Sequence, residues 1–327
     1  MNWYGRSLAS GCLAALAGLG LLSTRAQAQA YPTRSITMIV PFAAGGPTDV
    51  IARIVTGHMA QTLGQAIIIE NVVGAGGTTA TTRAARAAND GYTLITGHMG
   101  THAASVPLYP KLAYHPEKDF EPVALLAGTP ILILARKDFP PKDLKEFIAY
   151  VKANETKVNA AHAGVGSVSN VSCELLNSVL GIKPVGVPFN GTGPAMNALV
   201  AGQVDYMCDQ IVNAVPQVNG GTIKAYAVAT SERNPSLPDV PTTTEAGLPA
   251  FPAQAWNAIF APKGTSAEVV AKLNAAVGKA LDDEGVRKRL LDLGSVIPGV
   301  AERTPAALAA LVKSEIAKWT PVLKPAT

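Results

Sequence analysis

Charged and aromatic residues are scarce in this sequence, and positive charge is nowhere concentrated. Charged residues make up 15% of the 327 positions, aromatic residues 6% and hydrophobic residues 48%, and the formal net charge is +4. The densest basic run, residues 287–289 (RKR), follows acidic residues on a segment with helical periodicity, which is typical of a solvated helix face. The composition therefore argues against nucleic-acid binding and against disorder, and the length allows two domains.

Long hydrophobic runs are also absent. The apolar run at residues 13–22 (LAALAGLGLL) has ten residues, whereas a helix that spans a bilayer needs about 20. This run follows Arg6 and precedes small residues around Ala28 and Ala30, which is the pattern of a secretory signal peptide. We therefore predict that residues 1–30 are a signal peptide, cleaved near Ala28 or Ala30, and that the mature protein is exported.

Cysteine is rare, with three residues, and Cys12 lies in the predicted signal peptide. The other two, Cys173 and Cys208, could form a disulfide in an oxidising compartment, and the loop it closes would contribute roughly 3–4 kcal/mol to stability. Two buried, unreactive thiols are an equal alternative. Their spacing fits no metal-binding motif.

Motifs of nucleotide-binding proteins and hydrolases are missing as well. The chain has no G-x-G-x-x-G after its first expected strand, no G-x-x-x-x-G-K-[ST] and no G-x-S-x-G. His98 and His102 are four residues apart, as zinc ligands on a helix would be, but Gly100 between them favours a loop, and no third ligand is near. We predict no catalytic residues, no metal and no cofactor.

Short apolar strands alternate with amphipathic helices along the chain. The first strand is expected over residues 35–42, followed by a helix that Thr48 or Asp49 would cap. The alternation recurs over residues 131–208, and residues 234–252 form a proline-rich, irregular connection. This order predicts an α/β protein with mainly parallel sheets flanked by helices.

The chain is expected to pass between two lobes more than once. Crossings near residues 123–130 and 251–258 would place the two ends of the mature chain in one lobe. The predicted lobe 1 is residues 31–130 plus 252–327, and lobe 2 is residues 131–251.

Two predicted strand ends carry nearly the same sequence, VPFAAGGP at residues 40–47 and VPFNGTGP at residues 187–194. Further glycine-rich turns follow other strands, at residues 74–78, 97–102 and 163–167. Glycine lets backbone N–H groups approach a ligand, and a helix N-terminus favours an anion. Ligands of α/β sheets bind beyond the carboxyl ends of the strands, so we predict an anion pocket there. Because the twin segments contain no Lys or Arg, backbone amides, hydroxyls and Asn side chains would hold the anion.

At these motifs the sequence resembles the Bug (TctC-type) periplasmic solute-binding proteins of tripartite tricarboxylate transporters. The resemblance runs through most of the mature chain, in segments that read YPTRSITMIVPFAAGGPTDVIAR, IENVVGAGGT, GYTLITGH, AGVGSVS, VPFNGTGPAMNALVAGQVDYMCD and DVPTTTEAGLP. It implies a two-lobed periplasmic-binding-protein fold that closes on a small carboxylate. It also implies a monomer in the periplasm that delivers its ligand to membrane permease subunits.

The resemblance also implies which residues contact the ligand. One wall of the cleft would consist of Phe42, Ala43, Gly45, Gly46 and Thr48. The opposing wall would consist of Gly166, Ser167, Asn190, Gly191 and Thr192. The distal part of the ligand would meet His98, Thr101, Asn170 and Asp209.

Two positions depart from the family pattern. Ala44 stands where the family commonly has proline, and Asn170 where a histidine often follows the G-x-G-S loop. The second departure changes the distal chemistry, so the ligand is not assumed to be citrate. Two alternatives stay open, a chemosensory binding subunit with the same pocket and an exported α/β enzyme.

Overall fold

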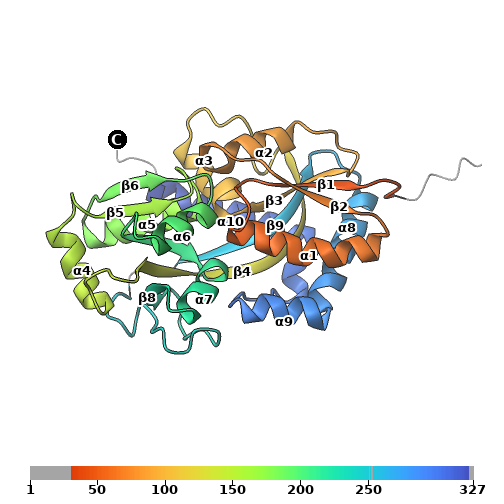
Figure 1. The fold of residues 1–327 in the computed structure, drawn as a ribbon. Helices are drawn as coiled ribbons and strands as arrows, with labels where there is room; N and C mark the ends of the chain where they lie inside the picture. The colour runs from red at the N-terminus through yellow and green to blue at the C-terminus, as the bar shows by residue number, and fades with distance from the viewer. Residues whose placement is uncertain (1–30, 250, 252, 324–327) are drawn as a thin grey trace, which may run out of the picture.

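The structure is a computed structural model that describes residues 31–249, 251 and 253–323. The predicted signal peptide lies outside the described residues. Within these residues, nine strands form one sheet, in the order β2-β1-β3-β9-β4-β7-β5-β6, with β8 paired to β4 (Figure 1). The strands are β1 (Ile36–Val40), β2 (Ile67–Asn71), β3 (Thr93–His98), β4 (Phe120–Arg136), β5 (Asn159–His162), β6 (Val185–Pro188), β7 (Tyr206–Gln210), β8 (Ile223–Val228) and β9 (Gln254–Pro262).

Helices cover both faces of this sheet. The α-helices are α1 (Pro47–Leu63), α2 (Thr78–Ala85), α3 (Ser105–Leu108), α4 (Leu144–Ala153), α5 (Val168–Leu180), α6 (Thr192–Val200), α7 (Ile211–Asn219), α8 (Ala267–Asp282), α9 (Glu284–Asp292) and α10 (Pro305–Leu323). The part of the chain that the structure describes also has three short helices of other types, η1 (Ala75–Gly77), η2 (Gly100–Ala104) and η3 (Val300–Arg303). Within the described residues, no helix combines the length and the apolar character needed to cross a membrane.

The long strand β4 joins two halves of the sheet and runs through the middle of Figure 1. Its residues 120–130 pair with β9, beside β1, β2 and β3, whereas its residues 131–136 pair with β7 and β8. Helices α4 to α7 lie with the second half, and α1 and α8 with the first (Figure 1). The chain therefore changes halves along β4 and returns along β9.

The predicted α/β class and the alternation of strands and helices are confirmed, but the sheet is mixed rather than mainly parallel. Strand β1 is parallel to β2 and β3, and β5 is parallel to β6 and β7. The two connecting strands β4 and β9 are antiparallel to each other, and each is antiparallel to its other neighbours. Strand β4 carries the chain from the first half of the sheet to the second, and β9 carries it back, so the two strands run in opposite directions.

Both faces of β4 are buried. Ile133 packs in one hydrophobic core, with Phe147 of α4, while Leu132 and Leu134 pack in the other, with Ile211 of α7. This division follows from the alternation of side chains along a strand. Because each core extends over both halves of the sheet, the halves share apolar contacts on either side of β4.

The two described cysteines are joined. Cys173 of α5 and Cys208 of β7 form a disulfide with a Cα–Cα distance of 5.3 Å. Both residues belong to elements of the second half, so the disulfide links helix α5 covalently to strand β7 and makes no link to the first half.

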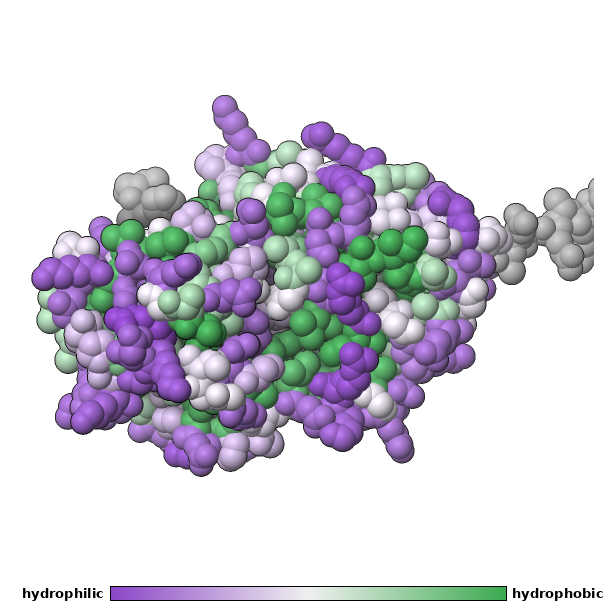
Figure 2. All heavy atoms as spheres, in the orientation of Figure 1, coloured by the Kyte–Doolittle hydropathy of each residue, from purple (hydrophilic) through white to green (hydrophobic). Residues whose placement is uncertain are grey.

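The exposed face in Figure 2 mixes hydrophilic and hydrophobic residues, and the hydrophobic areas are interrupted by hydrophilic ones. Large hydrophobic residues with substantial exposure come from many elements rather than one. They include Ile68, Val165, Val185, Leu291, Val296, Val300 and Val322. Scattered apolar side chains of this kind are ordinary on soluble proteins.

Candidate ligand-binding site

The two corners with similar sequences lie against each other, although they belong to opposite halves of the sheet. The Ala43 N–H donates to the Asn190 carbonyl oxygen at 2.9 Å. A Cβ atom built on Gly46 would lie 3.2 Å from Thr192 Oγ1. The corner after β1 and the corner after β6 therefore form two facing walls.

A small cavity lies between these walls; its empty volume of about 290 Å³ includes space open to solvent, and only about 20 Å³ of it can hold the centre of a water-sized molecule. It is lined by Phe42, Ala43, Gly46, Pro47, Thr48, Asp49, His98, Ala163, Ser167, Val168, Ser169, Thr192 and Gln210. None of these residues is a Lys or Arg, and that neutral groups hold an anion here stays a prediction.

The N-termini of α1, α5 and α6 meet at this cavity. The first intrahelical hydrogen bonds are donated by Val50 to Gly46 O, by Val171 to Ser167 O and by Ala195 to Gly191 O. N–H groups before these residues have no backbone carbonyl partner within their own helix. The positive ends of three helix dipoles therefore point toward one small space, which favours an anion.

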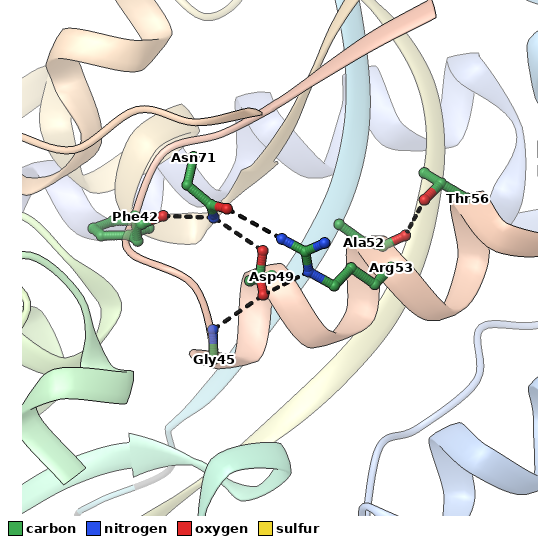
Figure 3. A network of polar contacts seen from close by, with 7 residues as sticks. All are labelled: Phe42, Gly45, Asp49, Ala52, Arg53, Thr56 and Asn71. Carbon is green, nitrogen blue, oxygen red and sulfur yellow. Dashed lines mark hydrogen bonds and ion pairs between the residues drawn. The ribbon is translucent and has the colours of Figure 1, made fainter. Parts of the chain in front are cut away.

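The first corner is held in place by a polar network around Asp49 (Figure 3). Asp49 accepts hydrogen bonds from Gly45 N–H at 3.0 Å, Arg53 Nε at 2.9 Å and Asn71 Nδ2 at 2.9 Å. The Asn71 Nδ2 group also donates to Phe42 O at 2.9 Å. Burial alone would raise the pKa of Asp49, but these hydrogen bonds and the Arg53 charge lower it overall. The ionised carboxylate fixes the loop rather than facing a ligand unpaired.

The helix cap predicted at Thr48 or Asp49 is wrong in detail. Helix α1 begins at Pro47, and Gly46 is its N-cap, without a side-chain cap. Proline fits the first helical position because its missing N–H would be unpaired there anyway. Asp49 lies in the first turn of the helix, where its carboxylate binds the Gly45 N–H, and Gly45 has a φ of 85° that favours glycine.

The loop before α5 is closed by its own side chains. The Asn170 side chain accepts from Gly166 N–H at 3.0 Å, and Ser167 Oγ accepts from Asn170 N–H at 3.2 Å. Ser167 Oγ also donates to Gly164 O at 2.7 Å. Ser169 Oγ accepts from Ala163 N–H at 2.9 Å, which leaves its hydroxyl hydrogen available toward the cavity or Ser167.

His98 lies at the end of β3, is 1% exposed, and its ring stacks on Phe42 with 5.1 Å between centroids. Its Nδ1 accepts hydrogen bonds from Gly100 N–H at 2.9 Å and Thr101 N–H at 3.2 Å. Burial lowers the pKa of His98 to about 4, so the ring is neutral at pH 7. An Nδ1 that accepts places the proton on Nε2, and His98 therefore offers the cavity a neutral N–H donor.

The expected loop at residues 97–102 is wrong, because Gly100–Ala104 is one helical turn with π-type hydrogen bonding. His102 points into the core, where it stacks on Phe260 at 3.9 Å between centroids. Within the described residues, no group of three or more His, Cys, Asp or Glu side chains is placed to hold a metal ion.

Asp209 is fully buried at the end of β7. Its carboxylate accepts from Gln210 N–H at 2.8 Å and from Asn213 Nδ2 at 2.6 Å. Burial raises the pKa of Asp209 to about 7, and the hydrogen bonds from Asn213, Gln210 and Thr192 offset only part of this effect. Asn213 also donates to Thr192 O at 3.1 Å. Asp209 therefore supports the beginnings of α6 and α7.

Asp209→Asn is expected to flatten the pH dependence of stability between about pH 4 and pH 7. In the wild type the folded carboxyl keeps its proton up to about pH 7, whereas the unfolded one loses it near 3.8. The free energy of unfolding therefore falls as pH rises through this window. The amide has no proton to release, so the variant lacks this component. Urea unfolding at a series of pH values would measure it, and curves that stay parallel for both proteins would contradict it.

A second, wider groove lies at the mouth of the cavity, with a volume of about 960 Å³ that includes space open to solvent. Tyr109 bridges the two halves there, because its hydroxyl lies 2.7 Å from Val165 O and 3.3 Å from Ala75 O. A Cβ atom on Gly76 would collide with the Val165 carbonyl oxygen. The loop of η1 therefore touches the loop before α5 directly.

The predicted site residues fall into two groups. Those that line the cavity are Phe42, Ala43, Gly46, Thr48, His98, Ser167 and Thr192. The others are not part of its lining and lie in the loops, helix ends and strand end around it, namely Gly45, Thr101, Gly166, Asn170, Asn190, Gly191 and Asp209.

Sequence reasoning missed the other lining residues, which are Pro47, Asp49, Ala163, Val168, Ser169 and Gln210. Gln210 directly follows Asp209 at a strand end, and this position was the available signal for it.

The chain matches the family model described as "Tripartite tricarboxylate transporter family receptor" (TctC) over residues 51–326. A protein of Agrobacterium vitis, described as "UPF0065 protein in the TAR-I ttuE-ttuC' intergenic region", is 42% identical over 315 residues. That alignment covers 96% of this chain and 91% of the other.

Several solved structures are also similar to this chain in both sequence and fold. MatC from Rhodopseudomonas palustris with bound malate is 61% identical, with a TM-score of 0.88, and the match covers 90% of this chain and 100% of that one. The periplasmic binding protein BugD is 42% identical with a TM-score of 0.87, over 90% and 98% of the two chains. An R. palustris protein with adipate is 32% identical with a TM-score of 0.85, over 90% and 97%.

Proposed function

Because the chain belongs to the TctC family of tripartite tricarboxylate transporter receptors, we propose that it is a periplasmic solute-binding protein. It captures a small carboxylate between two lobes and delivers the ligand to the membrane subunits of a transporter. The observation that carries this proposal is the convergence of three helix N-termini on a cavity lined without Lys or Arg.

Reversible binding fits this cavity better than catalysis. Backbone N–H groups, the Ser169 hydroxyl and the His98 Nε2–H are neutral donors that can hold a carboxylate without forming a covalent bond. Similar structures carry malate in MatC and adipate in the second R. palustris protein. The ligand that we propose for this chain is therefore a dicarboxylate, and the protein acts as a binding protein rather than an enzyme.

The two lobes of this proposal are residues 31–130 plus 252–327, and residues 131–251. The pairing of β4 supports this division, because its partner changes from β9 to β7 near residue 131. Contacts between the corners, such as Ala43 N–H to Asn190 O, would form only when the lobes close. Closure would therefore complete the site around the ligand.

A thermal-shift screen of the mature protein tests carboxylate binding. Di- and tricarboxylates, aromatic carboxylates and acidic amino acids would be compared with neutral sugars and zinc. A ligand at 100 times its Kd stabilises the folded state by about 2.7 kcal/mol, so we expect at least one carboxylate to raise Tm by several degrees. No response to any carboxylate, combined with a response to a sugar or to zinc, would refute the proposal.

Delivery needs a separate measurement in cells. Deletion of the gene should abolish uptake of the radiolabelled carboxylate found in the screen, and expression of the wild-type protein should restore it. Undiminished uptake in the deletion strain would remove the transport role while leaving the binding function in place.

A further inference from the structure

The loop before α5, residues 163–167, is contacted by several segments of the first half of the sheet. Ala163 and Ser167, at its two ends, line the cavity. Its middle residue, Val165, approaches η1 and Tyr109, which both belong to the first half. None of these residues lies in β4 or β9. The contacts can therefore separate while the two connecting strands stay paired.

Glycine residues bring the backbones of the two halves into direct contact here. A Cβ atom built on Gly100 of η2 would lie 2.6 Å from Gly166 O. One built on Gly164 would lie 3.0 Å from Gly76 N, and one built on Gly76 would collide with Val165 O. The loop therefore fits against η1 and η2 only because these positions carry no side chain.

One side-chain hydrogen bond crosses between the halves at this contact. The Tyr109 hydroxyl lies 2.7 Å from Val165 O and 3.3 Å from Ala75 O. Both neighbours are carbonyl oxygens, which only accept, so the hydroxyl is the donor in either bond. It has a single hydrogen, and the shorter bond is the stronger one, so the hydrogen goes mainly to Val165 O in the other half.

The loop presents the Val165 carbonyl oxygen to this bond. Its internal hydrogen bonds use Gly164 O and Gly166 N–H, on either side of that carbonyl group. The Val165 carbonyl oxygen accepts from Tyr109 instead. Tyr109 therefore holds the middle of a loop whose two ends line the cavity.

Ala75, the second neighbour of the Tyr109 hydroxyl, has an unfavourable backbone conformation. Its φ is 46°, and no other non-glycine residue that the structure describes has a positive φ. Strain of this kind is found at ligand clamps and switch regions. Because Ala75 and Tyr109 belong to the same half, Ala75 O stays within reach of the hydroxyl if the halves separate. The hydroxyl can then exchange one carbonyl partner for the other, which makes the bond to Val165 reversible.

On the premise of the carboxylate-binding function and lobe closure proposed above, we propose that Tyr109 is the latch of the closed state. Its hydrogen bond to Val165 O holds the loop at residues 163–167 against the first half and slows the departure of a bound carboxylate. Tyr109 lies at the mouth of the cavity and not in its lining. It is therefore a positioning residue, which acts on the ligand through the loop.

Tyr109→Phe removes the hydroxyl and keeps the ring. The loss of one hydrogen bond between the halves should raise the dissociation rate constant of the carboxylate about three- to tenfold. The association rate constant should stay within about twofold, because a ligand enters before the lobes close. Surface plasmon resonance with the immobilised mature protein would measure both constants. The probe is malate or, if malate gives no thermal shift, the carboxylate with the largest shift.

Tyr226→Phe is the matched control for the lost hydroxyl. The Tyr226 hydroxyl also donates to a backbone carbonyl, Pro141 O at 2.9 Å, but both residues lie in the second half. This variant should be less stable in urea unfolding and should release the carboxylate at the wild-type rate. A latch predicts this difference between the two variants, whereas general destabilisation predicts the same change in both.

A second pair of variants tests the contact without altering Tyr109. Gly76 and Gly64 have φ values of 60° and 67°, so alanine strains the backbone similarly at both positions. The added Cβ atom collides with Val165 O at Gly76, whereas at Gly64 it meets nothing within 4 Å. Gly76→Ala should weaken binding of the same carboxylate at least about tenfold, and Gly64→Ala should bind as the wild type does. Far-UV circular dichroism would establish that each variant is folded.

The outcomes separate this inference from the proposed function. An unchanged dissociation rate in Tyr109→Phe, or an equal increase in Tyr226→Phe, would overturn the latch and leave the carboxylate-binding function intact. Wild-type affinity in Gly76→Ala would show that the halves need not meet here when a carboxylate is bound, which would also overturn the latch. If the wild type binds no carboxylate in the thermal-shift screen or on the sensor surface, the proposed function fails, and this inference fails with it.

Discussion

Gly193→Ala is expected to reduce carboxylate affinity by about 10- to 100-fold while leaving the ligand-free protein folded. Gly193 is the second residue of α6, and its added Cβ atom would lie 2.8 Å from Ala44 O and 3.2 Å from Gly46 N in the opposite corner. Those backbone atoms cannot move aside without opening the contact between the corners. Alanine has a higher helix propensity than glycine, so the substitution should not destabilise α6 itself. The unfavourable free energy should therefore arise where the two corners come into contact.

Calorimetry would give the affinity of this variant, and urea unfolding would give its stability without ligand. Gly57→Ala is the matched control, because Gly57 is also in a helix and its added Cβ atom meets nothing within 4 Å. The control should bind as the wild type does. Wild-type affinity in Gly193→Ala would show that the corners need not approach this closely during binding.

Removal of the disulfide should have the second large effect, on stability rather than on binding. Cys173 and Cys208 are 35 residues apart, and the entropy of closing a loop of this length corresponds to about 4 kcal/mol in the unfolded chain. The double substitution Cys173→Ala and Cys208→Ala should therefore lower the free energy of unfolding by roughly 3–5 kcal/mol. Chemical denaturation of both proteins would measure the difference.

Reduction provides the control for this second experiment. A thiol reductant should destabilise the wild type by a similar amount and leave the double variant unchanged. Because the disulfide lies within one half of the sheet, carboxylate affinity well below the melting temperature should change little. Equal stability of the oxidised wild type and the double variant would contradict the prediction.

The sequence predicted the elements whose signals are local. Helix α1 and strand β1 were visible because apolar residues recur at helical and strand spacing, and the twin corners stood out through glycine and proline. The full length of β4 was missed because Pro122, Gly128 and Pro130 interrupt its apolar pattern. Pairing with β9 overrides those local signals, with irregular register near Pro122.

Site residues were harder to predict where their role depends on distant partners. Helix α7 was not predicted because it is short and contains Pro216. Gln210, which ends β7 directly before this helix and lines the cavity, was therefore not recognised as a site residue. The side chains of Asn170 and Asp209 bind Gly166 N–H and Asn213, and their predicted contact with the distal part of a ligand stays a prediction. Tertiary packing decides whether a polar side chain in a loop points toward the cavity or toward the protein. The spacing of residues in the sequence does not predict this direction.

The out-and-back course of β4 and β9 limits how the two halves can move. These strands are hydrogen-bonded side by side from Phe120 to Pro130, so they must bend together where they pass between the halves as a ribbon within the sheet. A ribbon flexes far more easily across its face than within its plane, so one direction of rotation dominates. In the proposed closure, each movement would bring the corner after β1 back to the same residues of the corner after β6. Strand pairing would then set the accuracy of the site, and little conformational entropy would remain to be lost on ligand binding.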